Sequence, residues 1–93
     1  MRITETEKRS IVQVLARADI DAPVYLFGSR ADDNARGGDI DLLVLSSKID
    51  LMGKLDVMAA LHAALGDQKI DLAIYPDTKT PFARMAINSG IRL

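Results

Sequence analysis

The stretch VYLFGSRADDNARGGDIDLLVLS (residues 24–46) contains two apolar runs, a Gly-Ser pair after the first run and four aspartates before and within the start of the second. The first run ends at Gly28 and is typical of a buried strand, and the second, GDIDLLVLS, predicts a longer strand. About nine residues separate the runs, too few for a helical crossover, so we expect antiparallel or mixed pairing. The aspartates place four carboxylates within ten residues, and such a density of negative charge beside a sheet requires an explanation.

Helical periodicity predicts a helix on each side of this stretch. Before it, Thr4 and Glu7 match a capping box, and apolar residues then recur at helical spacing through residues 5–18. After it, apolar residues repeat every three or four positions until Gly66, which is a typical helix stop. The repeating residues are Leu51, Leu55, Met58, Ala59, His62 and Leu65, and the possible caps are Ser46, Ser47 and Asp50. We expect His62, on this apolar stripe, to be packed or to face a partner.

The last part of the chain predicts one more strand and a short helix. KIDLAIY (residues 69–75) is the strand, and TPFARMAINSG (residues 80–90) predicts a helix with Pro81 in its first turn and Gly90 beyond its end. The terminal residues are more apolar than a free tail, so we expect them to dock on the domain or on a partner. Because a helix joins the second and third strands, these strands should run parallel. The sequence therefore predicts a small mixed α/β (α+β) fold, with helices packed on a sheet of three or more strands.

Length and composition narrow the class of protein. The 93 residues predict a single domain over residues 1–93, and a hydrophobic content of 48% predicts a packed core. The absence of cysteine excludes a disulfide framework and a cysteine zinc site. The net charge of -1 argues against a direct nucleic-acid binder, which needs a basic face. No run approaches the roughly 20 apolar residues of a membrane span, and the first residues lack a signal-peptide core, so we expect a cytoplasmic protein without membrane contact.

Asp39 and Asp41 carry the strongest chemical signal. Alternation along a strand places both carboxylates on one face and Ile40 on the other. In residues 69–75 the same alternation turns Asp71 away from the apolar face, so that it can join them. Ionised carboxylates held this close repel one another unless they share a cation, and Mg²⁺ and Mn²⁺ prefer such oxygen ligands. We therefore interpret the three aspartates as metal ligands, with Asp71 alternatively the general base that takes a proton from an attacking hydroxyl.

The Gly-Ser pair predicts a phosphate-binding turn. Gly28 lets the backbone approach a bulky anion, and Ser29 offers a hydroxyl and a backbone amide to phosphate oxygens. Arg30 and Arg36 could add charge-assisted hydrogen bonds to a triphosphate. The stretch thus combines a phosphate cradle with a metal-binding Asp-x-Asp.

The acidic loop also has simpler interpretations. Asp32 and Asp33 can be solvated loop residues that bind nothing. The offsets of Asp32, Asn34 and Gly37 match an EF-hand calcium loop. Leu43 occupies the position of the required glutamate, which excludes that kind of site. The chain has no Walker A motif either.

GSRADDNARGGDIDLL followed by KIDLAIY resembles the signature of the DNA polymerase β-like nucleotidyltransferase superfamily. In that signature a Gly-Ser motif precedes an Asp-x-Asp pair, and a later strand supplies a third carboxylate. The chain is most similar to the minimal nucleotidyltransferases (MNT) that are encoded beside HEPN-domain proteins. The resemblance implies catalytic metal ligands at Asp39, Asp41 and Asp71. It implies nucleotide-binding residues at Gly28, Ser29 and Arg30.

The resemblance also implies an activity and a partner. It implies an Mg²⁺-dependent enzyme that transfers AMP from ATP to a tyrosine of a HEPN-family ribonuclease toxin and so acts as the antitoxin in a hetero-oligomer. One of two Mg²⁺ ions would activate the acceptor hydroxyl, and the other would stabilise the pyrophosphate leaving group. Two alternatives stay open. One is a non-catalytic antitoxin of the same fold that occludes its partner, and the other is a transferase that modifies a small molecule such as an aminoglycoside.

Overall fold

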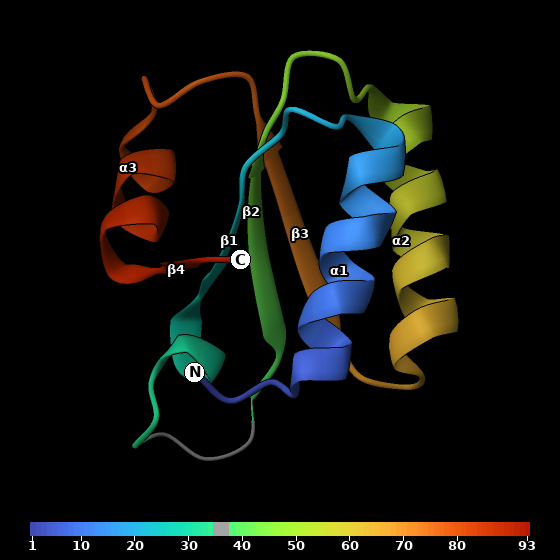
Figure 1. The fold of residues 1–93 in the computed structure, drawn as a ribbon. Helices are drawn as coiled ribbons and strands as arrows, with labels where there is room; N and C mark the ends of the chain where they lie inside the picture. Colours follow the sequence, from blue (N-terminus) through green and yellow to red (C-terminus); the bar gives the residue numbers. More distant parts are fainter. Residues whose placement is uncertain (35–37) are drawn as a thin grey trace.

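The computed structural model describes residues 1–34 and 38–93. The predicted helices and strands occur in the predicted order, and a short 3-10 turn and a fourth strand are present in addition. The helical elements are α1 (Glu5–Ala18), the short 3-10 turn η1 (Gly28–Ala31), α2 (Leu51–Leu65) and α3 (Pro81–Ser89). The strands are β1 (Val24–Phe27), β2 (Ile40–Leu45), β3 (Ile70–Tyr75) and β4 (Ile91–Arg92). α1 and α2 lie side by side on one face of the sheet, and α3 covers the other face (Figure 1). The predicted mixed α/β class is therefore confirmed.

The sheet has the strand order β3-β2-β1-β4. β2 and β3 are parallel, as the helical connection predicts, and their register pairs Asp41 with Asp71. β1 and β2 are antiparallel, and Phe27 pairs with Asp41. The short β4 pairs antiparallel with β1, where Ile91 lies opposite Leu26. The apolar end of the chain therefore docks on the domain itself, one of the two expected outcomes.

The strands divide their side chains between two cores. The larger core lies between the sheet and the helices α1 and α2. Its buried residues are Ile11, Leu15, Val24, Leu26, Ile40, Leu42, Val44, Val57, Leu61, Leu65, Ile70 and Leu72. The smaller core joins Leu43 of β2 to Ala83 and Ala86 of α3. Because successive strand residues point to opposite faces, Asp41 and Asp71 lie on the α3 side of the sheet, opposite the larger core.

The helices begin and end at the predicted local signals. The Thr4 hydroxyl accepts a hydrogen bond from the Glu7 amide at 3.0 Å, and the Glu7 carboxylate accepts one from the Thr4 amide at 2.8 Å, which is a complete capping box. Of the three possible caps of α2, Asp50 is the one used, since its carboxylate accepts a hydrogen bond from the Gly53 amide at 2.8 Å. Gly66 follows the last residue of α2 with a positive φ of 77°.

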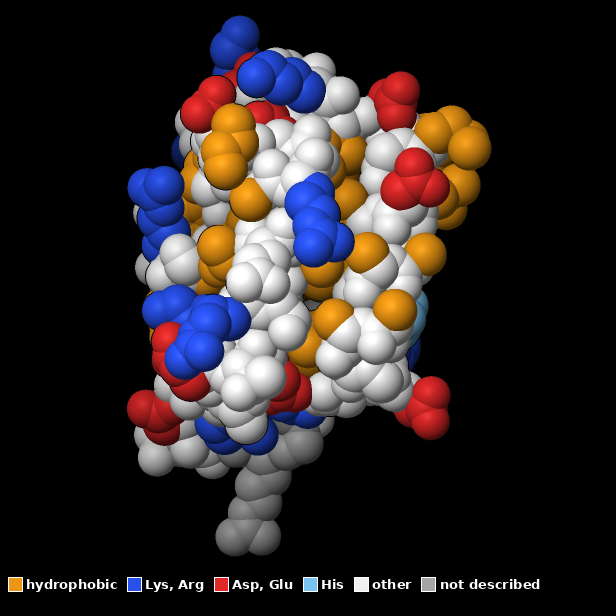
Figure 2. All heavy atoms as spheres, turned by 45° about the vertical axis from the view of Figure 1, so that its right-hand side comes forward, with side chains coloured by type: hydrophobic (Ala, Val, Ile, Leu, Met, Phe, Trp, Pro, Cys, Tyr) orange, Lys and Arg blue, Asp and Glu red, His pale blue; other side chains and the backbone are white. Residues whose placement is uncertain are grey.

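The predicted helix is confirmed, but its buried face is not the apolar stripe that predicted it, since Leu65 is the one buried member of that stripe. The residues of α2 that enter the core are Val57, Leu61 and Leu65, and Met58 packs partly against them. Leu51, Met52 and Leu55 are instead 73%, 66% and 54% exposed, and Figure 2 shows hydrophobic side chains gathered at one exposed end of the molecule. His62 is also exposed, so the expectation that it is packed is wrong, and a contact with a partner stays a prediction. The reason is that α2 is apolar nearly all round, so sequence spacing fits more than one face and packing against α1 selects between them.

A membrane span would need a long apolar helix. Within residues 1–34 and 38–93, every helix is too short or too polar to cross a bilayer.

Candidate active site

The structure brings together the three aspartates that the sequence singled out. Asp39 immediately precedes β2, and Asp41 is the second residue of that strand. Asp71 pairs with Asp41 on the parallel strand β3. One carboxylate oxygen from each lies within 4.8 Å of the others. Strand alternation produces this grouping, because Ile40, Leu42 and Ile70 take the core-facing positions and leave the aspartates on the opposite face.

The carboxylate cluster carries unfavourable electrostatics. Burial raises the pKa of Asp41 above its ordinary value, and the hydrogen bond to Asp71 and the charges of Asp71 and Asp39 raise it further. Lys69 opposes this effect and lowers the pKa of Asp41. The Lys69 ammonium lies 3.5 Å from the Asp39 carboxylate. Lys69 was not predicted as part of the site, although its position two residues before Asp71 would have indicated it.

The donor set of this cluster fits a divalent metal ion. Its three residues supply only carboxylate oxygens, which are the ligands that Mg²⁺ and Mn²⁺ prefer. Asp39 and Asp41 are half-buried, whereas Asp71 is exposed, so one side of the cluster is open to a substrate. The residues that would hold the ion are therefore Asp39, Asp41 and Asp71.

Gly28 has a second role beside the one expected. It has a positive φ of 72° at the first position of η1, a conformation that residues with a side chain rarely adopt. A Cβ atom at this position would overlap the Asp41 carboxylate. The missing side chain of Gly28 therefore makes room for a member of the carboxylate cluster, in addition to leaving the turn open to an anion.

Gly38 packs against the other predicted phosphate contact. It has a positive φ of 89°, and a Cβ atom here would overlap the Ser29 hydroxyl. This contact brings the residue before Asp39 against the Gly28–Ser29 turn. The sequence assigned no role to Gly38, and the adjacent glycines before the Asp-x-Asp are the signal that would have indicated one.

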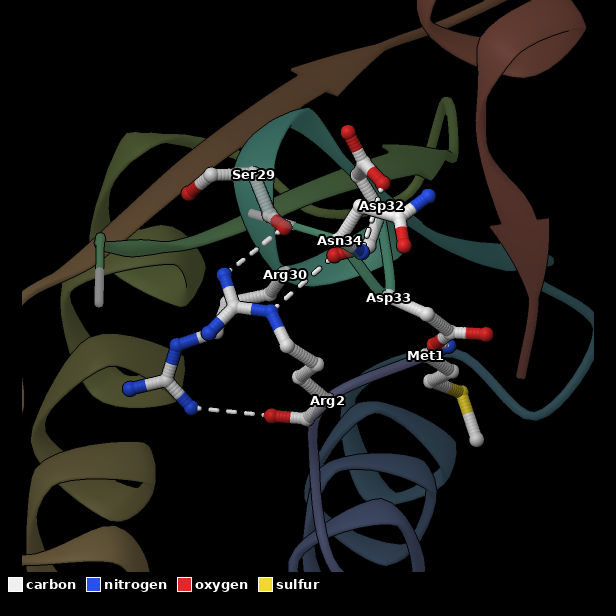
Figure 3. Close-up of polar contacts among 7 residues, drawn as sticks. All are labelled: Met1, Arg2, Ser29, Arg30, Asp32, Asp33 and Asn34. Carbon is white, nitrogen blue, oxygen red and sulfur yellow. Dashed lines mark hydrogen bonds and ion pairs between the residues drawn. The ribbon is translucent and has the colours of Figure 1, made fainter. Parts of the chain in front are cut away.

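Arg30 points its guanidinium into a network of hydrogen bonds within the protein. It donates to the carbonyl oxygens of Gly38 at 3.2 Å and Arg2 at 3.1 Å, and to the side-chain oxygen of Gln68 at 3.3 Å. Figure 3 shows Arg30 beside Arg2 at the turn. Its contact with a nucleotide therefore stays a prediction. Arg36, the other predicted cation, lies outside the described residues.

Asp32 and Asp33 lie in the loop after η1 and are not members of the carboxylate cluster. Both are exposed. The Asp32 carboxylate accepts a hydrogen bond from the Asn34 amide at 2.9 Å, and the Asp33 carboxylate pairs with the amino group of Met1 (Figure 3). These local contacts agree with their interpretation as loop residues.

Comparison with solved structures identifies similar folds in a toxin-antitoxin complex. One is a mutant of the toxin-antitoxin MntA-HpeT in which a tyrosine is replaced by alanine, with 25% sequence identity, a TM-score of 0.70, and coverage of 92% of this chain and 69% of that chain. Another is a MntA-HpeT mutant in which two aspartates are replaced by glutamate, with 24% identity, a TM-score of 0.72, and coverage of 92% and 70%. Comparison with curated proteins finds no match.

A family model covers almost the whole chain. The model described as "Polymerase beta, Nucleotidyltransferase" matches residues 9–93, a range that includes the Gly28–Ser29 turn and all three clustered aspartates. The match agrees with the sheet topology and with the carboxylates at the ends of two neighbouring parallel strands. The chain therefore belongs to the polymerase β nucleotidyltransferase family.

Proposed function

We propose that this chain is an Mg²⁺-dependent enzyme that transfers AMP from ATP to a hydroxyl of a partner protein. The observation that carries the proposal is the cluster of Asp39, Asp41 and Asp71, whose oxygens lie within 4.8 Å of one another, beside the Gly28–Ser29 turn. A transferase of this family needs a metal site and a phosphate site next to each other. Contact between Gly28 and Asp41 provides that adjacency here.

In the proposed reaction, the acceptor oxygen bonds to the α-phosphorus of ATP and the bond from that phosphorus to the bridging oxygen breaks, releasing pyrophosphate. Asp71 is the exposed member of the cluster, so it is the carboxylate that an acceptor hydroxyl reaches and the one that receives its proton. The Ser29 hydroxyl and the amides of the turn bind phosphate oxygens. Divalent ions bound by the three aspartates would neutralise charge on the transferred and leaving phosphates.

The proposed partner is a HEPN-type ribonuclease toxin, and the proposed acceptor is one of its tyrosines. The support is the similarity to the toxin-antitoxin MntA-HpeT. Modification would silence the toxin, so that this chain would act as the antitoxin.

The proposal is tested by incubating the purified chain and the proposed toxin partner with labelled ATP and Mg²⁺. We expect label on the toxin, and loss of label when Asp39 and Asp41 are both changed to Ala. Absence of transfer by the wild-type chain would contradict the proposed activity. If the double variant still neutralised the toxin in cells, neutralisation would instead depend on occlusion.

A further inference from the structure

Arg2 and Arg30 are joined by two hydrogen bonds beside the Gly28–Ser29 turn, one between their main chains and one from the Arg30 side chain. The Arg2 amide donates to the Arg30 carbonyl oxygen at 2.7 Å, and the Arg30 guanidinium donates to the Arg2 carbonyl oxygen at 3.1 Å. Figure 3 shows the bond from the Arg30 guanidinium to Arg2, with the first residues of the chain beside η1. We call this pair the arginine clasp.

The Arg2 side chain also binds the Gly28–Ser29 turn directly. Its guanidinium donates to the carbonyl oxygens of Ser29 at 2.8 Å and Asp32 at 3.0 Å (Figure 3). The Asp32 amide in turn donates to the Ser29 carbonyl oxygen at 3.1 Å, which closes η1. A planar guanidinium that binds two carbonyl oxygens fixes their relative position, because its donors are held in a rigid fork.

Arg30 connects the turn to both carboxylate-bearing segments. Its guanidinium binds the carbonyl oxygen of Gly38, the residue before Asp39. It also binds the side chain of Gln68, which lies three residues before Asp71. Gln68 is fixed in turn, since its amide donates to the Glu7 carboxylate at 2.7 Å and to the Leu65 carbonyl oxygen at 3.0 Å.

We infer that the arginine clasp positions the active site, and that Arg30 acts as a positioning residue and not as a phosphate ligand. This inference rests on the proposed nucleotidyl transfer. The Arg30 guanidinium donates to three protein oxygens, and the segments it joins are those that carry Ser29, Asp39 and Asp71. A displacement of about 1 Å at a reacting group can lower a rate by about 100-fold, so a clasp that fixes three segments affects catalysis strongly.

The two roles of Arg30 predict different effects of substitution. As a phosphate ligand, Arg30 would act alone, and Arg30→Ala would raise the KM for ATP while Arg2→Ala would have little effect. As part of the clasp, Arg30 acts through Arg2, so either substitution should lower kcat and weaken the binding of Mn²⁺ without nucleotide. Arg30→Lys separates the roles further, because lysine keeps the positive charge but cannot bind three oxygens as a fork.

The test compares Arg2→Ala, Arg30→Ala, Arg30→Lys and the Arg2→Ala, Arg30→Ala double variant. Arg9→Ala, at an exposed position of α1, is the control for loss of a positive charge. The measurements are transfer kinetics with ATP and the partner, Mn²⁺ affinity by electron paramagnetic resonance, and exchange of the Asp32 amide by NMR. We expect each single clasp variant to lower kcat about tenfold or more, to weaken Mn²⁺ binding and to speed exchange at Asp32. The double variant should be no worse than the more impaired single variant.

Wild-type Mn²⁺ affinity and wild-type exchange in Arg2→Ala, with only the KM for ATP raised in Arg30→Ala, would overturn the inference. If the alanine variants do not fold, Arg30→Lys decides the question, since activity close to wild type would also overturn it. If the wild-type chain transfers no AMP, the proposed function fails separately, and faster amide exchange in both single variants would still support the clasp.

Discussion

Replacement of Asp41 by asparagine is expected to stabilise the fold while it abolishes transfer. Asp41 is half-buried, and its carboxylate lies within 4.8 Å of those of Asp39 and Asp71. Two unit charges at this separation repel by about 0.9 kcal/mol in water and by about 3.5 kcal/mol at an effective dielectric constant of about 20. Asp41→Asn relieves two such pairs and loses the attraction of Lys69. We therefore expect the free energy of unfolding to rise by about 1–2 kcal/mol at neutral pH and low salt.

The gain in unfolding free energy from Asp41→Asn should increase as the pH rises. Burial and the neighbouring carboxylates raise the pKa of Asp41 in the folded chain. The folded chain therefore holds this proton more tightly than the unfolded chain does. The stability contributed by protonated Asp41 is present at low pH and is lost as pH rises through its folded-state pKa. The difference in unfolding free energy between Asp41→Asn and wild type should accordingly be small in acid and reach its full value at neutral pH.

Urea unfolding followed by circular dichroism measures this difference, with and without Mg²⁺. Added Mg²⁺ should stabilise the wild-type chain more than the variant, because a ligand that binds only the folded state adds to its stability. Asp67→Asn removes an exposed carboxylate outside the cluster and should change stability by less than about 0.5 kcal/mol. A variant Asp41→Asn less stable than wild type at neutral pH without metal would refute the reasoning.

Three further predictions, two of them with a control substitution, test the fold and the site. Gly28→Ala should lower stability by about 1–2 kcal/mol because of the positive φ at this position, and it should also impair transfer and Mn²⁺ binding. Gly66 has a similar φ of 77°, but an added Cβ would meet open space there, so Gly66→Ala should lower stability and leave activity intact. Leu61→Ala should cost about 2–5 kcal/mol, and Leu55→Ala less than about 0.5 kcal/mol, as measured by urea unfolding; equal losses would contradict the observed buried face of α2. Asp50→Ala removes the cap of α2 and should cost about 1 kcal/mol, seen as a lower midpoint of thermal unfolding with unchanged transfer.

The sequence predicted those features whose causes are local. The capping box of Thr4 and Glu7 and the stop at Gly66 depend only on neighbouring residues, so these helix ends were predicted correctly. The grouping of Asp39, Asp41 and Asp71 followed from strand alternation and the parallel connection, which are also properties of the pattern itself.

Features that depend on residues far apart in the chain could not be predicted from the sequence. The direction of the Arg30 guanidinium is set by Arg2 and Gln68, which are 28 and 38 residues away in the chain. The buried face of α2 depends on where α1 packs, since apolar residues occur on most of its surface. β4 has only two residues, too few for any periodic pattern, and it exists because β1 offers an edge to pair with.

The position of β3 at the edge of the sheet has a consequence for how the fold opens. Asp41 belongs to an interior strand, whereas Asp71 belongs to a strand with a neighbour on one side only. Edge elements open locally more readily than central ones, so fraying of β3 would dismantle the carboxylate cluster before the rest of the domain unfolds. A cation shared by Asp41 and Asp71 would act as a cross-strand staple. Slower hydrogen exchange along β3 in the presence of Mg²⁺ would then report occupancy of the site directly, without any partner or substrate.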